Sequence, residues 1–257
     1  MKNKFKNAVI FGASQGIGKA LALEYAKDDT TLLLLSKNEK GIAELSGEIT
    51  AKGKICYYSY CDISKKDDVA KGIKFAVEKL GAIDLVIINS GVGLKNWMEN
   101  FSSDALLRMI EVNTFGIAHV LEYLIPIMKK QGYGTIAGVS SLSDIRGYSG
   151  STSYSASKAA ASILLEGARI ELKEFNIKVV TVRPGFVKTA MTDKNEFKMP
   201  FMMQTDKAAR IIKRGIEKGK SIVQFPFFTV NATRLIKFLP NWLFDWGMKL
   251  ARPVEKK

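Results

Sequence analysis

The chain has 257 residues, 47% of them hydrophobic, and its formal net charge is +14. This length and composition fit one large α/β domain or two small ones. No apolar run reaches the ~18 residues of a membrane span, and the apolar start is too short for a signal peptide. The two cysteines exclude a disulfide framework, so we expect a cytoplasmic protein with reduced thiols.

The positive charge is concentrated toward the end of the chain. From position 188 onward there are 15 basic and 6 acidic residues, an excess that suits a solvated surface, an acidic membrane surface or an anionic substrate. Nucleic acid is not an expected partner, because no recognition motif and no alternation of aromatic and basic residues is present. A metal site is not expected either, since the single histidine and the two cysteines lack ligand spacing.

A glycine-rich loop follows the first predicted strand. Residues 8–11 are a short apolar run, and residues 19–27 have the pattern of a helix. Between them, backbone N–H groups at the start of the helix can hold the charge of a pyrophosphate, and glycines let the backbone approach it. The order of strand, loop and helix therefore predicts a nucleotide site. Its expected contacts are Gly12, Ser14, Gln15, Gly16, Ile17 and Gly18.

The second predicted strand, residues 31–35, ends at Ser36-Lys37-Asn38. An acidic residue at this point would bind the ribose 2′-hydroxyl of NAD, whereas a basic residue just beyond accommodates the 2′-phosphate of NADP. The chain has no acid here and does have Lys37. This favours NADP(H) over NAD(H), unless Lys37 is an ordinary surface lysine.

Strands and helices alternate through the rest of the chain. We expect further strands at 55–59, 84–88, 135–139 and 177–182, and helices at 40–52, 64–80 and 154–175. Residues 103–130 are expected to form one long helix or two abutting helices. The helix at 64–80 begins with a capping-box-like Ser64-Lys-Lys-Asp67. The alternation predicts a Rossmann-like, doubly wound parallel sheet with helices on both faces and ligands at the carboxyl ends of its strands.

Tyr154 and Lys158 lie four residues apart in the predicted helix at 154–175 and therefore share one of its faces. A nearby ammonium lowers the pKa of a phenol toward neutrality. Such a tyrosine can donate a proton to a carbonyl oxygen or accept one from an alcohol. Because the chain has 8 tyrosines and many lysines, such a pair can occur by chance. It indicates an active site only if the chain also has a cofactor site.

Taken together, these motifs resemble the short-chain dehydrogenase/reductase family over about residues 5–225. Phe11 stands where the family usually has threonine, and the segment Ile88-Asn89-Ser90-Gly91 matches the family's N-N-A-G only at its second and fourth positions. The matching residues are Gly12, Gly16, Gly18, Asp62, Asn89, Gly91, Asn113, Ser141, Tyr154, Lys158, Pro184, Gly185 and Thr189.

The resemblance implies a catalytic tetrad of Asn113, Ser141, Tyr154 and Lys158. Tyr154 would be the acid or base, Lys158 would lower its pKa and hold the nicotinamide ribose, and Ser141 would bind the substrate oxygen. Asn113 would anchor a water in a proton relay, although a structural asparagine at a helix kink is an alternative from the residues alone. Further cofactor contacts are implied for Ser36, Lys37, Asp62, Ile63, Asn89, Ser90, Gly91, Pro184, Gly185, Val187 and Thr189.

The resemblance also implies a homodimer or homotetramer that pairs through the predicted helices at 103–130 and 154–175. Its substrate loop corresponds to residues 190–204, which are rich in Met and Phe. This composition suits a large lipophilic substrate in contact with Met191, although packing of the loop itself would use the same residues.

Residues 226–257 extend beyond the expected catalytic domain at 1–225. They are rich in apolar and aromatic residues, charged and polar residues interrupt this run, and Pro240 divides it, so we expect two short amphipathic helices. These helices would cover the substrate cleft, pack in a dimer or dock on a membrane surface through residues 226–253. The predicted function is an NADP(H)-dependent oxidoreductase of a lipophilic ketone or alcohol, and the alternative is a non-catalytic NADP-binding protein of the same fold.

Overall fold

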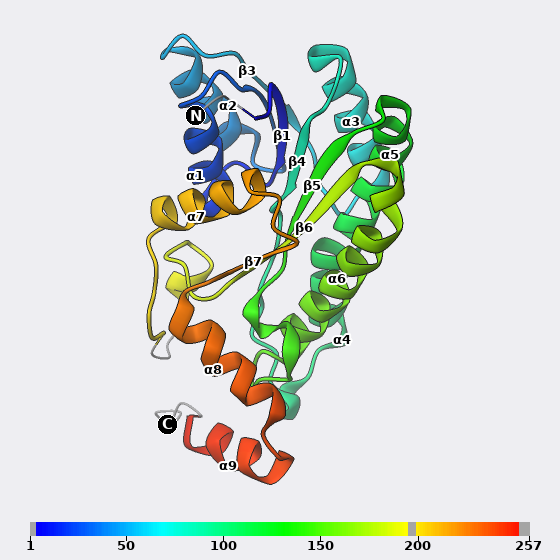
Figure 1. The fold of residues 1–257 in the computed structure, drawn as a ribbon. Coiled ribbons are helices and arrows are strands. Elements are labelled where there is room, and N and C mark those ends of the chain that lie inside the picture. The colour runs from blue at the N-terminus through cyan, green and yellow to red at the C-terminus, as the bar shows by residue number, and fades with distance from the viewer. Residues whose placement is uncertain (1–3, 195–198, 252–257) are drawn as a thin grey trace.

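The computed structural model describes residues 4–194 and 199–251 and contains a parallel sheet (Figure 1). Its described residues form seven strands in the order β3-β2-β1-β4-β5-β6-β7, and every pairing is parallel. The strands are β1 Asn7–Phe11, β2 Thr31–Ser36, β3 Cys56–Tyr60, β4 Leu85–Ile88, β5 Gly134–Val139, β6 Ile177–Pro184 and β7 Ile222–Phe225. The first six confirm the predicted strands within two residues at each end. The seventh is an addition.

Helices cover both faces of the sheet (Figure 1). They are α1 Gly16–Tyr25, α2 Glu39–Thr50, α3 Lys66–Leu80, α4 Ser103–Ile110, α5 Gly116–Gln131, α6 Thr152–Glu171, α7 Thr205–Glu217, α8 Phe227–Phe238 and α9 Asn241–Ala251. Alternate residues of β1 enter two separate cores: Ala8 and Ile10 pack with helices α1, α2 and α7, while Val9 and Phe11 pack with α3, α5 and α6. The predicted Rossmann-like fold is confirmed.

Two predicted helical segments have a detail in the structure that matters for the site. The helix expected from Ser64 begins at Lys66, and the Ser64 hydroxyl donates to Asp62 at 2.7 Å instead of capping the helix. Of the two alternatives expected for residues 103–130, the structure has two helices, α4 and α5, joined by a π-helical segment, Glu111–Phe115, which contains Asn113. A π-helical turn inserts one residue into a helix and redirects the side chains that follow.

The last two helices follow β7 and lie at one end of the molecule (Figure 1). Val230 is the buried residue of α8, and most other side chains of α8 and α9 remain partly or largely exposed. None of the helices formed by the described residues is long and apolar enough to cross a membrane.

Candidate active site

Tyr154 and Lys158 lie in the first two turns of α6, beside the carboxyl end of β5. Lys158 is buried, with 3% of its surface exposed, and its Nζ donates to the carbonyl of Val139 at 2.9 Å. The same Nζ lies 5.9 Å from the centre of the Tyr154 ring, on the shared face that their four-residue spacing predicted. Strand β5 therefore holds the lysine, and the lysine lies beside the phenol.

Burial dominates the acid–base properties of this pair. It raises the pKa of Tyr154 above its ordinary value, a hydrogen bond with Ser141 acts in the opposite direction, and the charge of Asp144 raises the pKa again. Burial lowers the pKa of Lys158 to about 8. The prediction that Lys158 brings the Tyr154 pKa down toward neutrality is therefore wrong for this structure, because the desolvation of the phenolate is the largest effect.

Ser141 begins the short 3-10 turn Leu142–Ile145 that follows β5. Its hydroxyl oxygen accepts from the backbone N–H of Ser143 at 3.1 Å, and only 8% of the residue is exposed. Together with the hydrogen bond to Tyr154, this places the serine and tyrosine hydroxyls at one point. A substrate oxygen at that point would meet both.

Asn113 is fully buried in the π-helical segment, and its side chain joins three parts of the chain. Its Oδ1 accepts from Val92 N–H, and its Nδ2 donates to the Val92 carbonyl and to Ser157 Oγ, each at 2.9 Å. The Ser157 hydroxyl in turn donates to the Tyr154 carbonyl at 2.7 Å. Asn113 therefore occupies a helix irregularity and also links the segment after β4 to the helix that carries Tyr154. Its place in a proton relay stays a prediction.

A buried ion pair that we did not predict lies directly behind these residues. Asp144, in the turn that Ser141 begins, pairs with Arg183 of β6 and accepts from Ser162 of α6 at 2.5 Å. Only 3% of the Asp144 side chain is exposed. The pair thus joins the serine turn, the tyrosine helix and the strand that ends at Pro184. No sequence motif predicted this ion pair, because the two partners are 39 residues apart in the sequence.

The glycine loop fits a diphosphate. Gly12 has φ +74°, and a Cβ on Gly18 would lie 2.1 Å from the carbonyl oxygen of Gly12, so neither position accepts a side chain. Asn89 Nδ2 closes the loop by donating to the same carbonyl at 3.0 Å. Helix α1 begins after Gln15 with no side-chain cap and no acidic residue in its first turn. The N–H groups and positive dipole end of the helix are therefore available to an anion.

The same loop contacts the end of β2, where the site for the cofactor ribose is predicted. Ser36 at the end of β2 donates to Ser14 Oγ at 3.0 Å, and Lys37 Nζ lies 2.9 Å from Asp62 Oδ2. Burial alone would raise the pKa of Asp62, but hydrogen bonds from Lys37 and Ser64 lower it to about 2. Asp62 is therefore a fixed carboxylate. The next residue, Ile63, is buried.

The segment after β6 reaches both the loop and the catalytic residues. Thr189 lies against Gly16, since a Cβ there would be 3.1 Å from Thr189 Cγ2. Val187 pairs with Met203 in an isolated β-bridge, which closes the base of the substrate loop. Two glycines after β4 lie close to the catalytic side chains. A Cβ built on Gly93 would be 3.5 Å from both Met191 Sδ and Tyr154 Cδ2, and a Cβ built on Gly91 would be 3.3 Å from Lys158 Nζ.

The structure thus brings the predicted residues together at one edge of the sheet. Pro184 ends β6, Gly185 N–H donates to Phe225 O at 2.8 Å, and Ser90 packs against Gly12. Ile17 packs on the core from the first turn of α1. The predicted loop residue Phe197 lies outside the described residues.

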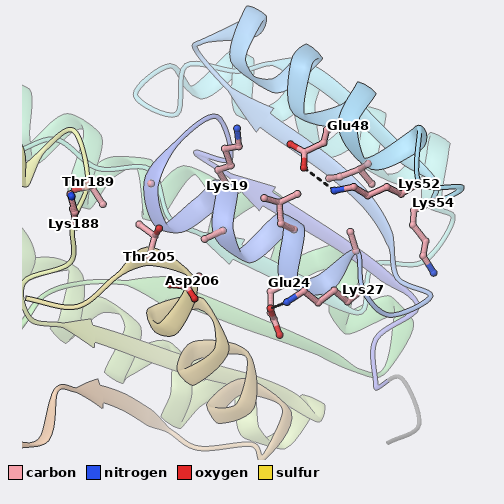
Figure 2. Close-up of a pocket in the computed structure, with 15 residues that line it drawn as sticks. Lys19, Glu24, Lys27, Glu48, Lys52, Lys54, Lys188, Thr189, Thr205 and Asp206 are labelled. Atoms are coloured by element: carbon pink, nitrogen blue, oxygen red, sulfur yellow. Dashed lines mark hydrogen bonds and ion pairs between the residues drawn. The ribbon is translucent and has the colours of Figure 1, made fainter.

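A pocket between α1, α2 and α7 is separate from the catalytic residues (Figure 2). Its walls carry Lys19, Lys27 and Lys52, and Lys52 forms an ion pair with Glu48 at 2.9 Å. It shares Gly16 and Thr189 with the cofactor residues but contains none of the four catalytic ones. We therefore do not assign it to the substrate.

The fold and this edge of the sheet define a Rossmann-type oxidoreductase that binds a nicotinamide dinucleotide. The comparisons with known proteins agree. Residues 6–199 match the family model of the short chain dehydrogenases. An uncharacterized oxidoreductase of Myxococcus xanthus is 34% identical over 248 residues, which cover 96% of this chain and 98% of the relative.

Solved structures show the same fold. A short chain dehydrogenase/reductase from Burkholderia phymatum in complex with NAD has a TM-score of 0.85 at 21% identity, with 100% of this chain and 99% of the other covered. An alcohol dehydrogenase from the archaeon Thermococcus sibiricus, complexed with 5-hydroxy-NADP, has a TM-score of 0.78 at 27% identity and coverages of 86% and 95%. The chain belongs to the short-chain dehydrogenase/reductase family and is an NAD(P)-dependent dehydrogenase/reductase.

Proposed function

We propose that this protein transfers hydride between NADP(H) and a ketone or secondary alcohol of a lipophilic substrate. The observation that carries the proposal is the arrangement of Tyr154, Ser141 and Lys158 beside the carboxyl end of β5, at the same sheet edge as an uncapped glycine loop. The nicotinamide supplies or accepts the hydride when it is bound.

The side chains provide the proton and the electrostatic environment. In reduction, Tyr154 donates its hydroxyl proton to the substrate oxygen, and Ser141 donates a hydrogen bond to the same oxygen as charge develops there. Lys158, with a pKa of about 8, is still protonated at neutral pH and stabilises the phenolate that Tyr154 leaves. Oxidation follows the same path in reverse.

The preference for NADP(H) is supported by Lys37. It follows directly after β2, where no acid is present to bind a ribose 2′-hydroxyl, and 62% of its side chain is exposed. A cation in this place can meet a 2′-phosphate.

A lipophilic substrate is supported by the exposed apolar side chains of the predicted substrate loop, of which Met191 lies near Tyr154. Met191 and Met202 are 39% and 38% exposed, and Phe201 is 59% exposed although its ring stacks on Phe228 at 5.4 Å. Exposed Met and Phe side chains adapt to large apolar molecules. We further propose a cytoplasmic location with peripheral contact to a membrane through residues 226–253.

The test measures oxidation of NADPH and of NADH with a series of ketones of increasing chain length and ring size. We expect kcat/KM to be higher with NADPH and to rise with the apolar area of the ketone. Equal values for the two cofactors would refute the preference, and a rate independent of apolar area would refute the substrate class. Tight NADPH binding without turnover of any ketone or alcohol would favour the non-catalytic alternative.

A further inference from the structure

The helices α8 and α9 expose an unusual amount of large apolar side chain. Seven such residues in this segment are each at least 60% exposed, and Phe238 reaches 82%. The set, which we call the C-terminal apolar surface, is Phe227, Phe228, Leu235, Phe238, Trp242, Trp246 and Leu250. An apolar surface of this kind on a soluble protein marks a binding site for another molecule.

Helical spacing places these residues on one side of each helix. In α9, Trp242, Trp246 and Leu250 follow one another at intervals of four and therefore form a single stripe. The inward side of the same helix is occupied by Phe244, which is only partly exposed. The tryptophan stripe therefore cannot be explained as the packing face of α9.

Arg146 fixes the two helices to the body of the protein. Its guanidinium donates to the carbonyls of Ile236 and Leu239 at 3.2 and 2.8 Å and to Asn241 Oδ1 at 2.8 Å. It also lies 4.1 Å from the centre of the Phe244 ring. Arg146 directly follows the turn Leu142–Ile145, which begins after Ser141. The C-terminal apolar surface is thus held in a defined orientation relative to the active site.

The charges around this surface favour an anionic partner. Residues 226–257 contain 6 basic and 2 acidic residues, and the whole chain carries +14. Arg234, Lys237 and Lys249 are exposed on the same two helices. A second copy of this chain would bring like charges together, whereas anionic lipid headgroups attract them. Tryptophan and phenylalanine are also the side chains that favour the boundary between headgroups and acyl chains.

We propose that the C-terminal apolar surface docks on an anionic lipid membrane, with its aromatic rings in the interface and its cations at the headgroups. The stacking of Phe201 on Phe228 then places the substrate loop beside the lipid, so a lipophilic substrate can enter from the membrane. The docking deepens the peripheral membrane contact of the proposed function, and the entry of substrate rests on its lipophilic substrate. A binding measurement tests the docking without turnover, so its failure is distinguishable from a failure of the proposed catalysis.

The experiment is co-sedimentation of the full-length protein with vesicles of phosphatidylglycerol mixed with phosphatidylcholine, and with vesicles of phosphatidylcholine alone. We expect binding to the first, weaker binding to the second, and loss of binding as salt is raised. The tryptophan emission should also shift to the blue on binding, because two of the three tryptophans lie in α9.

Two pairs of variants separate the apolar and the electrostatic contributions. The double variant Trp242→Ser/Trp246→Ser should lower the vesicle partition coefficient at least about tenfold, whereas Ile55→Ser, which removes a side chain 57% exposed next to β3, should not. Arg234→Glu/Lys237→Glu should lower it by about fivefold or more for each cation. The control Lys71→Glu/Lys74→Glu makes the same change in net charge on α3, outside the C-terminal apolar surface. It should lower the partition coefficient clearly less.

Equal binding to neutral and anionic vesicles would overturn the proposal, as would controls that reduce binding as much as the test variants do. Sedimentation velocity supplies one further outcome. If the tryptophan variant instead converts an oligomer to monomers, the surface is a contact between copies of this chain and the proposal fails. NADPH binding by every variant confirms that the cofactor domain is folded.

Discussion

Lys37 Nζ donates to Asp62 Oδ2 at 2.9 Å, which joins the residues that follow β2 and β3. The two partners differ in exposure: 62% of the Lys37 side chain is exposed but only 8% of that of Asp62. The carboxylate also accepts from the backbone and hydroxyl of Ser64 at 3.1 and 2.7 Å. Asp62 is therefore fixed, and it orients a lysine that can still reach an anion from solution.

Lys37→Ala tests this orientation. The variant should bind NADPH about 10- to 100-fold more weakly, because a hydrogen bond between charged groups is typically worth about 1.5–3 kcal/mol. NADH affinity should change little, since NADH has no 2′-phosphate. Fluorescence titration of both cofactors measures this, and Lys40→Ala, an exposed lysine on α2, is the control. A parallel loss of NADH affinity would show that Lys37 acts on the fold of the site and not on the phosphate.

The ion pair of Asp144 with Arg183 yields a prediction about pH. The charge of Asp144 raises the pKa values of both Tyr154 and Lys158. Asp144→Asn removes this charge, so both values should fall and the apparent pKa in the pH profile of kcat/KM should move to lower pH. The variant should also lose up to about 3 kcal/mol of stability, because Arg183 loses its partner in a largely buried place.

Ser162→Ala is the matched control for this change. It removes a hydrogen bond to the same carboxylate, 2.5 Å long, but leaves the charge in place. Its pH profile should therefore keep the apparent pKa of the parent enzyme. An unmoved profile in Asp144→Asn would show that the ion pair is only a structural link.

Two serines of α6 provide a stability prediction. Ser157 Oγ accepts from buried Asn113 and donates to the Tyr154 carbonyl, whereas the buried Ser155 hydroxyl has no hydrogen-bond partner. Ser157→Ala should cost about 1–3 kcal/mol, since it leaves an Asn113 donor unpaired. Ser155→Ala should be neutral or stabilising, because it removes a buried polar group that has no partner. Urea unfolding measures both, and equal effects would contradict the assigned contacts.

The sequence predicted most of the fold, because alternating apolar runs and turns are local signals. Leu32 to Leu35 are all buried, as a continuous apolar run in a parallel sheet requires. The π-helical segment around Asn113 was not predictable, since the residues that stabilise it, Val92 and Ser157, are 21 and 44 positions away. The same holds for Ser162 and Arg183, the partners of Asp144, which are 18 and 39 positions away. Ser64 was mispredicted for another reason: its spacing to Asp67 resembles a cap, but its hydroxyl donates to Asp62, two positions away.

The direction of the Tyr154 pKa shows a second limit. Four-residue spacing predicts that Lys158 and Tyr154 share a face, and they do. It contains no information on how much water each side chain loses, and this loss controls both pKa values in the structure. The neighbours of the pair are the end of β5, the segment after β4 and Ser141, so only the assembled fold determines how much water each side chain loses.

The oligomeric state remains a prediction, now with a defined surface. Exposed apolar side chains lie on or next to the helices through which we expect the chains to pair: Leu107, Phe115, Ile163 and Ile170 are 54%, 53%, 71% and 62% exposed. We expect a homodimer or homotetramer of closed symmetry by light scattering. Ile163→Glu should lower the measured mass, because it places a charge in the contact, whereas Lys71→Glu on α3 should not. A monomer at micromolar concentration would refute the prediction.

The final prediction concerns the proton donor. Tyr154→Phe removes one hydroxyl, so the cofactor affinity and the free energy of unfolding should change little, while kcat should fall by about 10²–10⁴-fold. In the parent enzyme, reduction requires a protonated Tyr154 and a charged Lys158, whose pKa is about 8. The reduction rate should therefore be highest below this pH and fall as the pH rises through an apparent value that belongs to the coupled pair. Steady-state rates across pH, with NADPH titration and urea unfolding of each protein, provide the check. A Tyr154→Phe enzyme that retains full turnover and the same pH profile would mean that another group supplies the proton.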